Sequence, residues 1–209
     1  MNLDFLRRIG CFPSPDERQL TLVAGSDAEA SADMILDRSE LKPNSFVHLH
    51  PASRWMFKCW PAARNGMLID RLYENGWPVV VTSAPGTEER EFVRAVLKSS
   101  RQGAIDLSGQ LSLKEMVALT KRARLFVGVD SAPMHIAAAV GTPTVALFGP
   151  SGAPEWGPWQ VSHRLLTNSA FPCVPCGRDG CGGSKVSECL EEIPVEQVLG
   201  AALDLLNTP

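Results

Sequence analysis

The segment from Val127 to His135 carries the residue types that a phosphate-binding turn needs. An apolar run ends at Asp130, and Ser131, Ala132 and Pro133 precede an apolar helical pattern. Serine is favoured at a helix N-cap, and proline is favoured in the first turn, where its missing N–H costs nothing. The free N–H groups of such a turn attract anions, and small residues let a ligand approach the backbone. Taken alone, the segment fits both a diphosphate site and a purely structural strand-to-helix turn.

The elements around this turn are predicted to alternate between strand and helix. Runs rich in apolar and β-branched residues predict strands at 46–50, 78–82, 104–107, 125–129, 144–148 and 161–166. Helical patterns lie at 61–74, from 87 onward, and at 112–122, 132–140 and 194–206. This alternation is typical of βαβ units with right-handed crossovers. The sequence therefore predicts an α/β fold with a doubly wound, Rossmann-like parallel sheet.

Residues 1–45 do not follow the same alternation. Short helices are predicted at 5–9 and 27–36 and a short strand at Leu20–Ala24, with proline and charged residues scattered between them. We interpret 1–45 as a linker and 46–209 as the folded domain.

Composition narrows the class of protein. The net charge is -3, whereas a nucleic-acid-binding protein usually carries a clustered excess of Lys and Arg. The N-terminus does not resemble a signal peptide, and no apolar run approaches the ~18 residues of a membrane span. We therefore expect no nucleic-acid partner and a cytoplasmic location with reduced thiols. Composition leaves open a peripheral contact with a membrane surface.

Four of the six cysteines fall in one loop, at positions Cys173, Cys176, Cys181 and Cys189. Four thiolates can bind a structural zinc ion in a tetrahedron. Their spacing differs from the paired Cys-x2-Cys pattern that is typical of zinc sites, so free, packed cysteines are the alternative.

The run 126–150, FVGVDSAPMHIAAAVGTPTVALFGP, closely resembles the signature of glycosyltransferase family 9. These are the lipopolysaccharide core heptosyltransferases, which have the two-domain GT-B fold. Lys58-Cys59-Trp60-Pro61 matches the Lys-x-Trp-Pro element of the family, and Gly86-Thr87-Glu88 matches its Gly-x-Glu element. Residues 53–60 are most similar to heptosyltransferases of the third type, which add a branching heptose.

The resemblance implies a site for ADP-heptose in which Lys58 holds the diphosphate and stabilises the leaving group. The N–H groups of Ser131, Ala132 and the following turn would bind phosphate, and His135 would donate to a phosphate oxygen. From the residues alone, Lys58 also fits a surface lysine whose stem covers apolar surface, and His135 a satisfied buried histidine.

Two carboxylates complete the donor site that the resemblance implies. Glu88 would accept hydrogen bonds from the ribose or the adenine, and Asp130 would accept them from sugar hydroxyls. Glu88 alone also fits a first-turn carboxylate that favours its helix dipole. Transfer would be a metal-independent, inverting displacement onto the heptosylated, lipid A-linked core, so no cofactor is expected.

The family's catalytic base belongs to an N-terminal acceptor domain. On the resemblance, 1–45 is a linker and a remnant of that domain, and 46–209 is the ADP-heptose-binding C-terminal half. We expect such a chain to bind ADP or ADP-heptose and, by itself, to transfer sugar poorly or not at all. The alternatives are an inactive nucleotide-binding remnant and a UDP-sugar GT-B enzyme such as an epimerase.

Overall fold

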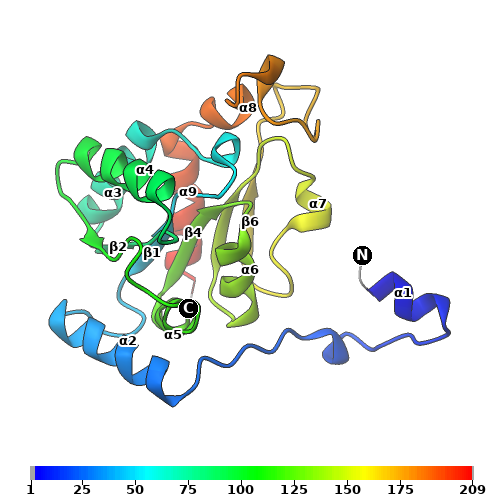
Figure 1. The fold of residues 1–209 in the computed structure, drawn as a ribbon, viewed down its shortest axis with the longest axis horizontal. Helices are drawn as coiled ribbons and strands as arrows, with labels where there is room; N and C mark the ends of the chain where they lie inside the picture. The colour runs from blue at the N-terminus through cyan, green and yellow to red at the C-terminus, as the bar shows by residue number, and fades with distance from the viewer. Residues whose placement is uncertain (1–2, 209) are drawn as a thin grey trace.

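The computed structural model of the protein describes residues 3–208, and a six-stranded parallel sheet lies at its centre (Figure 1). The strand order is β3-β2-β1-β4-β5-β6, and every neighbouring pair is parallel. The strands are β1 (Val47–His50), β2 (Val79–Val81), β3 (Ile105–Asp106), β4 (Leu125–Val129), β5 (Thr144–Leu147) and β6 (His163–Leu166). The predicted doubly wound, Rossmann-like α/β fold is confirmed.

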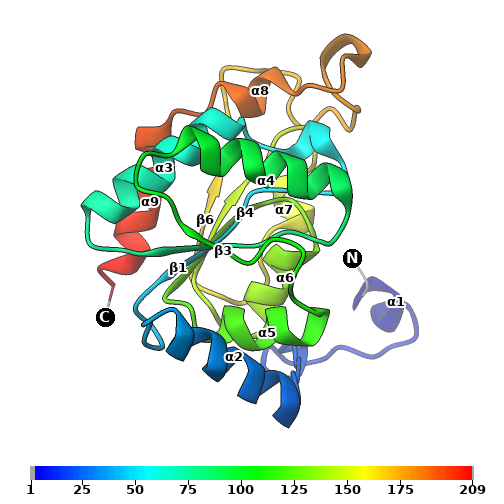
Figure 2. The same ribbon diagram turned by 60° about the vertical axis from the view of Figure 1, so that its left-hand side comes forward.

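Helices cover both faces of the sheet (Figure 2). One face packs against α3 (Ala62–Glu74), α4 (Thr87–Ser99) and α9 (Val195–Leu206). The other packs against α5 (Leu113–Arg122) and α6 (Ala132–Ala139). Because helices cover both faces, the strands read as nearly continuous apolar runs.

The two-residue period of a strand divides β1 between the two faces. Val47 and Leu49 belong to the core under α3 and α9, whereas Phe46 packs in the cluster with Leu119 of α5. His48 lies on the side of Phe46, with its ring edge-on to Phe126 at 5.2 Å between centroids. His50 is two residues further along the chain and therefore shares that face.

Local sequence signals set the first residues of three helices. Ser112 and Glu115 form the predicted capping box, in which each side chain accepts from the other residue's N–H, at 3.3 and 2.8 Å. Pro61 and Pro194 stand at the N-caps of α3 and α9, where a proline interrupts no helical hydrogen bond. The predicted bounds of these three helices agree with the structure to within one residue.

The strand predicted at Leu20–Ala24 is wrong. The backbone there is irregular, and Leu20, Leu22 and Val23 are exposed. Apolar, β-branched residues favour a strand only where a neighbouring strand pairs with them, and none of the described strands lies beside this segment. The segment connects α1 (Leu3–Arg8) and the 3-10 turn Asp16–Arg18 to the rest of the chain.

Part of the segment interpreted as a linker packs against the domain. α2 (Ser26–Arg38) lies along the outer side of α5 (Figures 1 and 2). Ala28 and Ala32 contact the cluster around Ala118, and Arg122 forms ion pairs with Glu29 and Asp33. The boundary at residue 45 stays a prediction.

The C-terminal part of the described chain contains three further short elements. These are α7 (Ala153–Trp156), the 3-10 turn Cys181–Gly183 and α8 (Glu188–Glu191). Among residues 3–208, no helix combines the length and the apolar character that crossing a membrane requires.

Two helical glycines offer a matched test of the packing between α3 and α4. A Cβ on Gly66 would overlap Ser99 Oγ and would lie 2.8 Å from the Ser99 backbone carbon, whereas a Cβ on Gly200 would meet nothing within 4 Å. We expect Gly66→Ala to lower the free energy of unfolding by about 1–3 kcal/mol, because α4 must move. Gly200→Ala should raise it by about 0.5–1 kcal/mol, because alanine suits a helix interior better. Urea denaturation measures both, and equal effects would contradict the packing.

Candidate functional site

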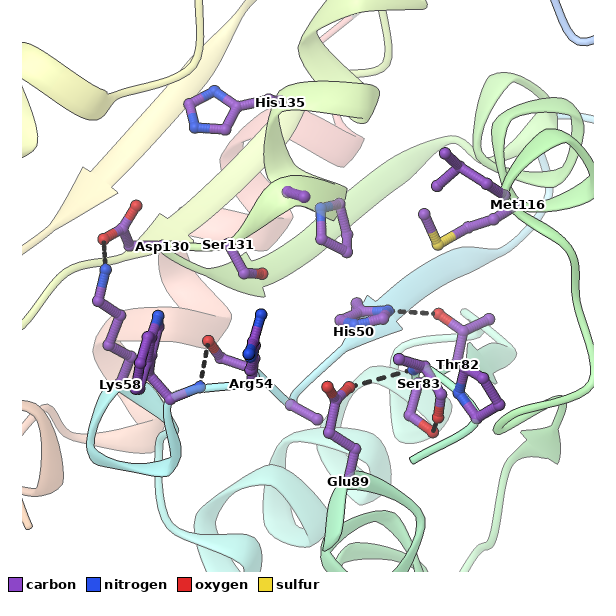
Figure 3. Close-up of a pocket in the computed structure, with 18 of the residues that line it drawn as sticks. His50, Arg54, Lys58, Thr82, Ser83, Glu89, Met116, Asp130, Ser131 and His135 are labelled. Carbon is purple, nitrogen blue, oxygen red and sulfur yellow. Dashed lines mark hydrogen bonds and ion pairs between the residues drawn. The ribbon is translucent and has the colours of Figure 1, made fainter. Parts of the chain in front are cut away.

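A cavity of about 740 Å³ lies at the carboxyl ends of β1, β2 and β4 (Figure 3). We call it the strand-end cavity. The chain order of the strands reverses between β1 and β4, and ligands of open α/β sheets bind outside such a switch point. Its polar and charged lining residues are His50, Ser53, Arg54, Lys58, Thr82, Ser83, Glu89, Ser112, Asp130, Ser131, His135 and Ser151.

An ion pair joins two predicted site residues that are far apart in the sequence. Lys58 ends the 3-10 turn Met56–Lys58 after β1, and Asp130 directly follows β4. Lys58 Nζ donates to Asp130 Oδ2 at 2.6 Å, and the two side chains are only 22% and 10% exposed. The structure therefore places a partly desolvated cation and a carboxylate together at one end of the cavity (Figure 3).

The N-terminus of α6 opens into the same end of the cavity. Ser131 stands at the N-cap with extended backbone angles, and Ala132 and Pro133 form the first turn. The Ser131 side chain accepts no capping hydrogen bond from this terminus, and its hydroxyl donates to the Val129 carbonyl at 3.4 Å. The helix terminus thus keeps its attraction for an anion.

His135 lies one turn into α6 and is half-buried (Figure 3). Burial lowers the pKa of His135, and the negative charge of Asp130 partly opposes this shift. The ring can therefore donate one hydrogen bond to a bound anion while remaining neutral near pH 7.

The structure places Glu88 apart from the other predicted residues. Glu88 is exposed and outside the cavity lining, whereas its neighbour Glu89 lines the cavity. Glu89 Oε2 accepts from the backbone N–H of Ala84 at 3.1 Å. Both glutamates lie in the first turn of α4, and successive side chains of a helix point in directions about 100° apart, so only one of the two faces the cavity. The role predicted for Glu88 stays a prediction.

Sequence reasoning missed a chain of buried polar groups under the cavity. Thr82 Oγ1 lies 2.7 Å from His48 Nε2 and 2.8 Å from His50 Nδ1. His48 Nδ1 lies 3.0 Å from Thr120 Oγ1, which donates to the Met116 carbonyl at 2.6 Å. The signal in the sequence was two histidines, two residues apart, in a strand that is otherwise apolar.

The opposite end of the cavity is mostly apolar. Pro85, Leu111, Leu113 and Met116 line it. Leu113 is 67% exposed although it is a large apolar side chain. An apolar wall that faces open space can pack against the flat face of a base or of another ring.

The four clustered cysteines do not assemble as ligands in this structure. Cys189 is buried, and burial, followed by the neighbouring thiols, raises its pKa. Within residues 3–208, no three histidine, cysteine, aspartate or glutamate side chains are placed to hold a metal ion. The zinc site proposed for Cys173, Cys176, Cys181 and Cys189 therefore stays a prediction, which the metal content of the reduced protein can decide.

A cavity with a cationic end, an open helix terminus and an apolar end, at the switch point of a Rossmann-like sheet, is the architecture of nucleotide-binding α/β domains. A comparison with known protein families gives a more specific assignment than this architecture does. The model of glycosyltransferase family 9 (heptosyltransferase) matches residues 13–186, and the chain belongs to this family.

Curated relatives agree with this assignment. Lipopolysaccharide heptosyltransferase 3 of Escherichia coli is 39% identical over 126 residues, which are 60% of this chain and 37% of the relative. The protein of the same name from E. coli strain K12 is 34% identical over 162 residues, which are 77% of this chain and 46% of the relative. The chain thus spans less than half the length of these relatives.

Solved structures show the same fold. A family 9 glycosyltransferase from Veillonella parvula has a TM-score of 0.82 at 25% identity, over 99% of this chain and 59% of its own. ADP-heptose LPS heptosyltransferase II of E. coli has a TM-score of 0.69 at 22% identity, over 90% and 53%. E. coli heptosyltransferase WaaC, solved with ADP, has a TM-score of 0.63 at 16% identity, over 96% and 54%.

The two buried histidines predict a loss of stability in mild acid. Burial lowers the pKa of His48 to about 3 and that of His50 to about 4. In the unfolded chain, these two histidines bind protons below about pH 6.5. In the folded chain, the same two side chains stay neutral until far lower pH. The free energy of unfolding should therefore fall from pH 6.5 toward pH 5, with a slope approaching ~1.4 kcal/mol per pH unit for each histidine.

Urea denaturation of the wild type and of His50→Phe over this pH range measures the effect. Most carboxylates stay ionised above about pH 5, so the histidines dominate the slope there. The variant should lose roughly a third to a half of the slope, because His48 keeps its contribution and the lowered pKa of His135 adds a further part. A wild-type stability that is flat between pH 6.5 and pH 5 would contradict the burial of neutral histidines.

Proposed function

We propose that this chain is the donor-binding half of an ADP-heptose:lipopolysaccharide heptosyltransferase. The whole protein would transfer heptose, with inversion, to the heptosylated lipid A-linked core at the cytoplasmic face of the inner membrane. The observation that carries the proposal is the Lys58–Asp130 pair beside the open N-terminus of α6, inside a cavity large enough for a nucleotide.

The diphosphate fits the cationic end of the cavity. Lys58 supplies a mobile positive charge, and the first turn of α6, from Ser131 onward, supplies a dipole and backbone donors. His135 lies within the same lining and can donate to a phosphate oxygen. When the bond to the sugar breaks, the charge that develops on the departing ADP would be stabilised by groups already in place.

Asp130 is suited to the sugar rather than to the phosphate. A carboxylate accepts hydrogen bonds from hydroxyls and repels phosphate oxygens. In the structure its charge is neutralised by Lys58 at 2.6 Å. Once the diphosphate takes over Lys58, the carboxylate is free to accept from the heptose hydroxyls.

The nucleoside fits the apolar end, where Leu111, Leu113 and Met116 can cover the base. The proposal that the base is adenine is supported by the ADP-heptose named for the E. coli heptosyltransferase II structure and by the ADP in the WaaC structure. A UDP-sugar enzyme is the competing proposal, and nucleotide preference separates the two.

Transfer itself is a proposal for the whole protein, because this chain spans less than half the length of its curated relatives. The base that deprotonates the acceptor hydroxyl would come from the acceptor domain of that protein. No divalent metal is needed in this proposal, since Lys58 and the helix terminus supply the positive charge.

Calorimetric titration with ADP and UDP tests the phosphate site. Lys58→Ala should weaken ADP binding about 10- to 100-fold, because it removes a charge-assisted contact worth ~1.5–3 kcal/mol and leaves Asp130 unpaired beside the phosphates. Lys98→Ala, an exposed lysine of α4 outside the cavity, is the matched control and should bind like the wild type. Adding EDTA should change the affinity of the wild type for neither ADP nor UDP. Equal binding of ADP to both variants, or preference for UDP, would count against the proposal.

Replacing Asp130 tests the sugar contact separately. Asp130→Asn removes a negative charge from the phosphate end, so ADP should bind at least as tightly as to the wild type. The gain in affinity from ADP to ADP-heptose should shrink, because an amide is a weaker acceptor than a carboxylate for the sugar hydroxyls. The ratio of the two dissociation constants, measured on one protein preparation, is the readout. An unchanged ratio would remove Asp130 from the sugar site.

A further inference from the structure

The buried polar chain beneath the strand-end cavity fixes which hydrogen-bonding face the cavity presents to a nucleotide. The inference below rests on the proposed function, because it assigns a specificity-determining residue to the same site. It starts from Met116, whose backbone carbonyl can only accept. The Thr120 hydroxyl, 2.6 Å away, therefore donates its single proton there. Its oxygen remains as an acceptor for His48 Nδ1 at 3.0 Å.

Because each hydroxyl and each neutral imidazole has a single proton to donate, the direction of every later hydrogen bond in this series is also fixed. A neutral His48 that donates from Nδ1 has an unprotonated Nε2. The Thr82 hydroxyl must donate to that nitrogen, at 2.7 Å, and its proton is then used. The Thr82 oxygen accepts from His50 Nδ1 at 2.8 Å. Burial keeps both rings neutral, since it lowers both pKa values well below 6.5.

His50 therefore carries its proton on Nδ1 and a lone pair on Nε2. The residue is only 3% exposed and lines the cavity. No described residue bonds to its Nε2, yet no fully buried side-chain nitrogen or oxygen of the described residues lacks a partner. This nitrogen consequently reaches the open space of the cavity, on the side of the ring away from Thr82 (Figure 3).

We infer that His50 Nε2 accepts a hydrogen bond from a hydroxyl or amino group of the bound nucleoside and so contributes to nucleotide specificity. Phosphate oxygens are acceptors and cannot satisfy a lone pair. They are held instead by Lys58 and the α6 terminus. The nucleoside supplies O–H donors on the ribose and an N–H donor on the adenine amino group, and it lies next to the apolar wall that begins at Met116.

Thr82, His48 and Thr120 are positioning residues in this scheme. Each hydrogen bond of the buried series determines which atom of the next residue carries the proton. Thr120, at the start of the series, lies outside the cavity lining. The N–H of a histidine free in water resides mainly on Nε2, which would present a donor. The chain reverses this preference and turns His50 into an acceptor.

Long-range ¹H–¹⁵N correlation spectra of the unliganded 209-residue protein test the tautomer directly. Near pH 7, we expect His50 to show a protonated Nδ1 and an unprotonated Nε2. Thr120→Val removes the hydroxyl at the start of the chain and should shift His50 toward the other tautomer, whereas Thr120→Ser should restore the wild-type pattern. Because the spectra also report folding, a misfolded variant is recognised at once. A protonated Nε2 in the wild type would overturn the inference.

Binding of nucleotide analogues tests the contact. ADP is compared with 2′-deoxy-ADP, with 3′-deoxy-ADP, and with inosine diphosphate, whose ring carries an oxygen where adenine has the amino group. We expect at least one analogue to bind the wild type about tenfold or more weakly than ADP, and His50→Phe to lose most of that difference. The analogue that responds identifies whether the ribose or the base meets His50.

The outcomes separate this inference from the proposed function. If ADP binds the wild type and all three analogues bind equally well, the donor site stands and the role of His50 is refuted. If His50→Phe keeps the full discrimination of the wild type, another residue provides it and the inference again fails. If no adenine nucleotide binds to the folded protein, the proposed function fails and the inference fails with it.

Discussion

Three neighbouring parallel strands end at the same level of the sheet, and this register fixes the geometry of the site. Leu49 of β1 pairs with Val81 of β2 and with Val127 of β4. The residues that follow, His50, Thr82 and a little later Asp130, therefore emerge at one edge. A slip of one residue would turn each polar side chain to the opposite face. The apolar clusters on both faces of the sheet oppose such a slip, so the packing of the core also holds the site.

The site then has to keep two opposite charges in a partly desolvated place. A lone lysine or a lone aspartate with so little exposure would carry a large desolvation cost, which the Lys58–Asp130 pair offsets. The pair also allows Lys58 to change its anionic partner when a ligand binds. On the proposed function, a diphosphate at Lys58 would replace one anion by another around the same cation, and the released carboxylate would accept from hydroxyls of the sugar. On the proposed function, binding would therefore exchange the partner of Lys58, and the Asp130 carboxylate would keep hydrogen-bond donors in place of its cation.

Local sequence signals predicted most of this architecture. The turn at 129–133 could be recognised because one contiguous segment supplies the strand, the small residues and the helix start. Lys58 came from the family resemblance, and the structure brings it to Asp130. The buried chain through His50 and Thr82 could not be predicted, because it depends on which strands are neighbours and on their register. The strand expected at Leu20–Ala24 failed for the related reason that propensity does not supply a partner strand.

The strand-end cavity has two unlike ends, and this difference fixes one orientation for the proposed ligand. At one end, Lys58 and the α6 terminus favour negative charge. At the other, the lone pair of His50 and the apolar wall at Met116 disfavour it. A nucleoside diphosphate bound in reverse would set its phosphates against a neutral acceptor and would leave Lys58 with no anion except Asp130. In the favoured orientation, the sugar attached to the second phosphate would lie beyond Asp130, near α7, whose Trp156 lines the cavity. The sugar carbon that reacts would therefore lie at the open rim of the sheet edge, where an acceptor can approach it.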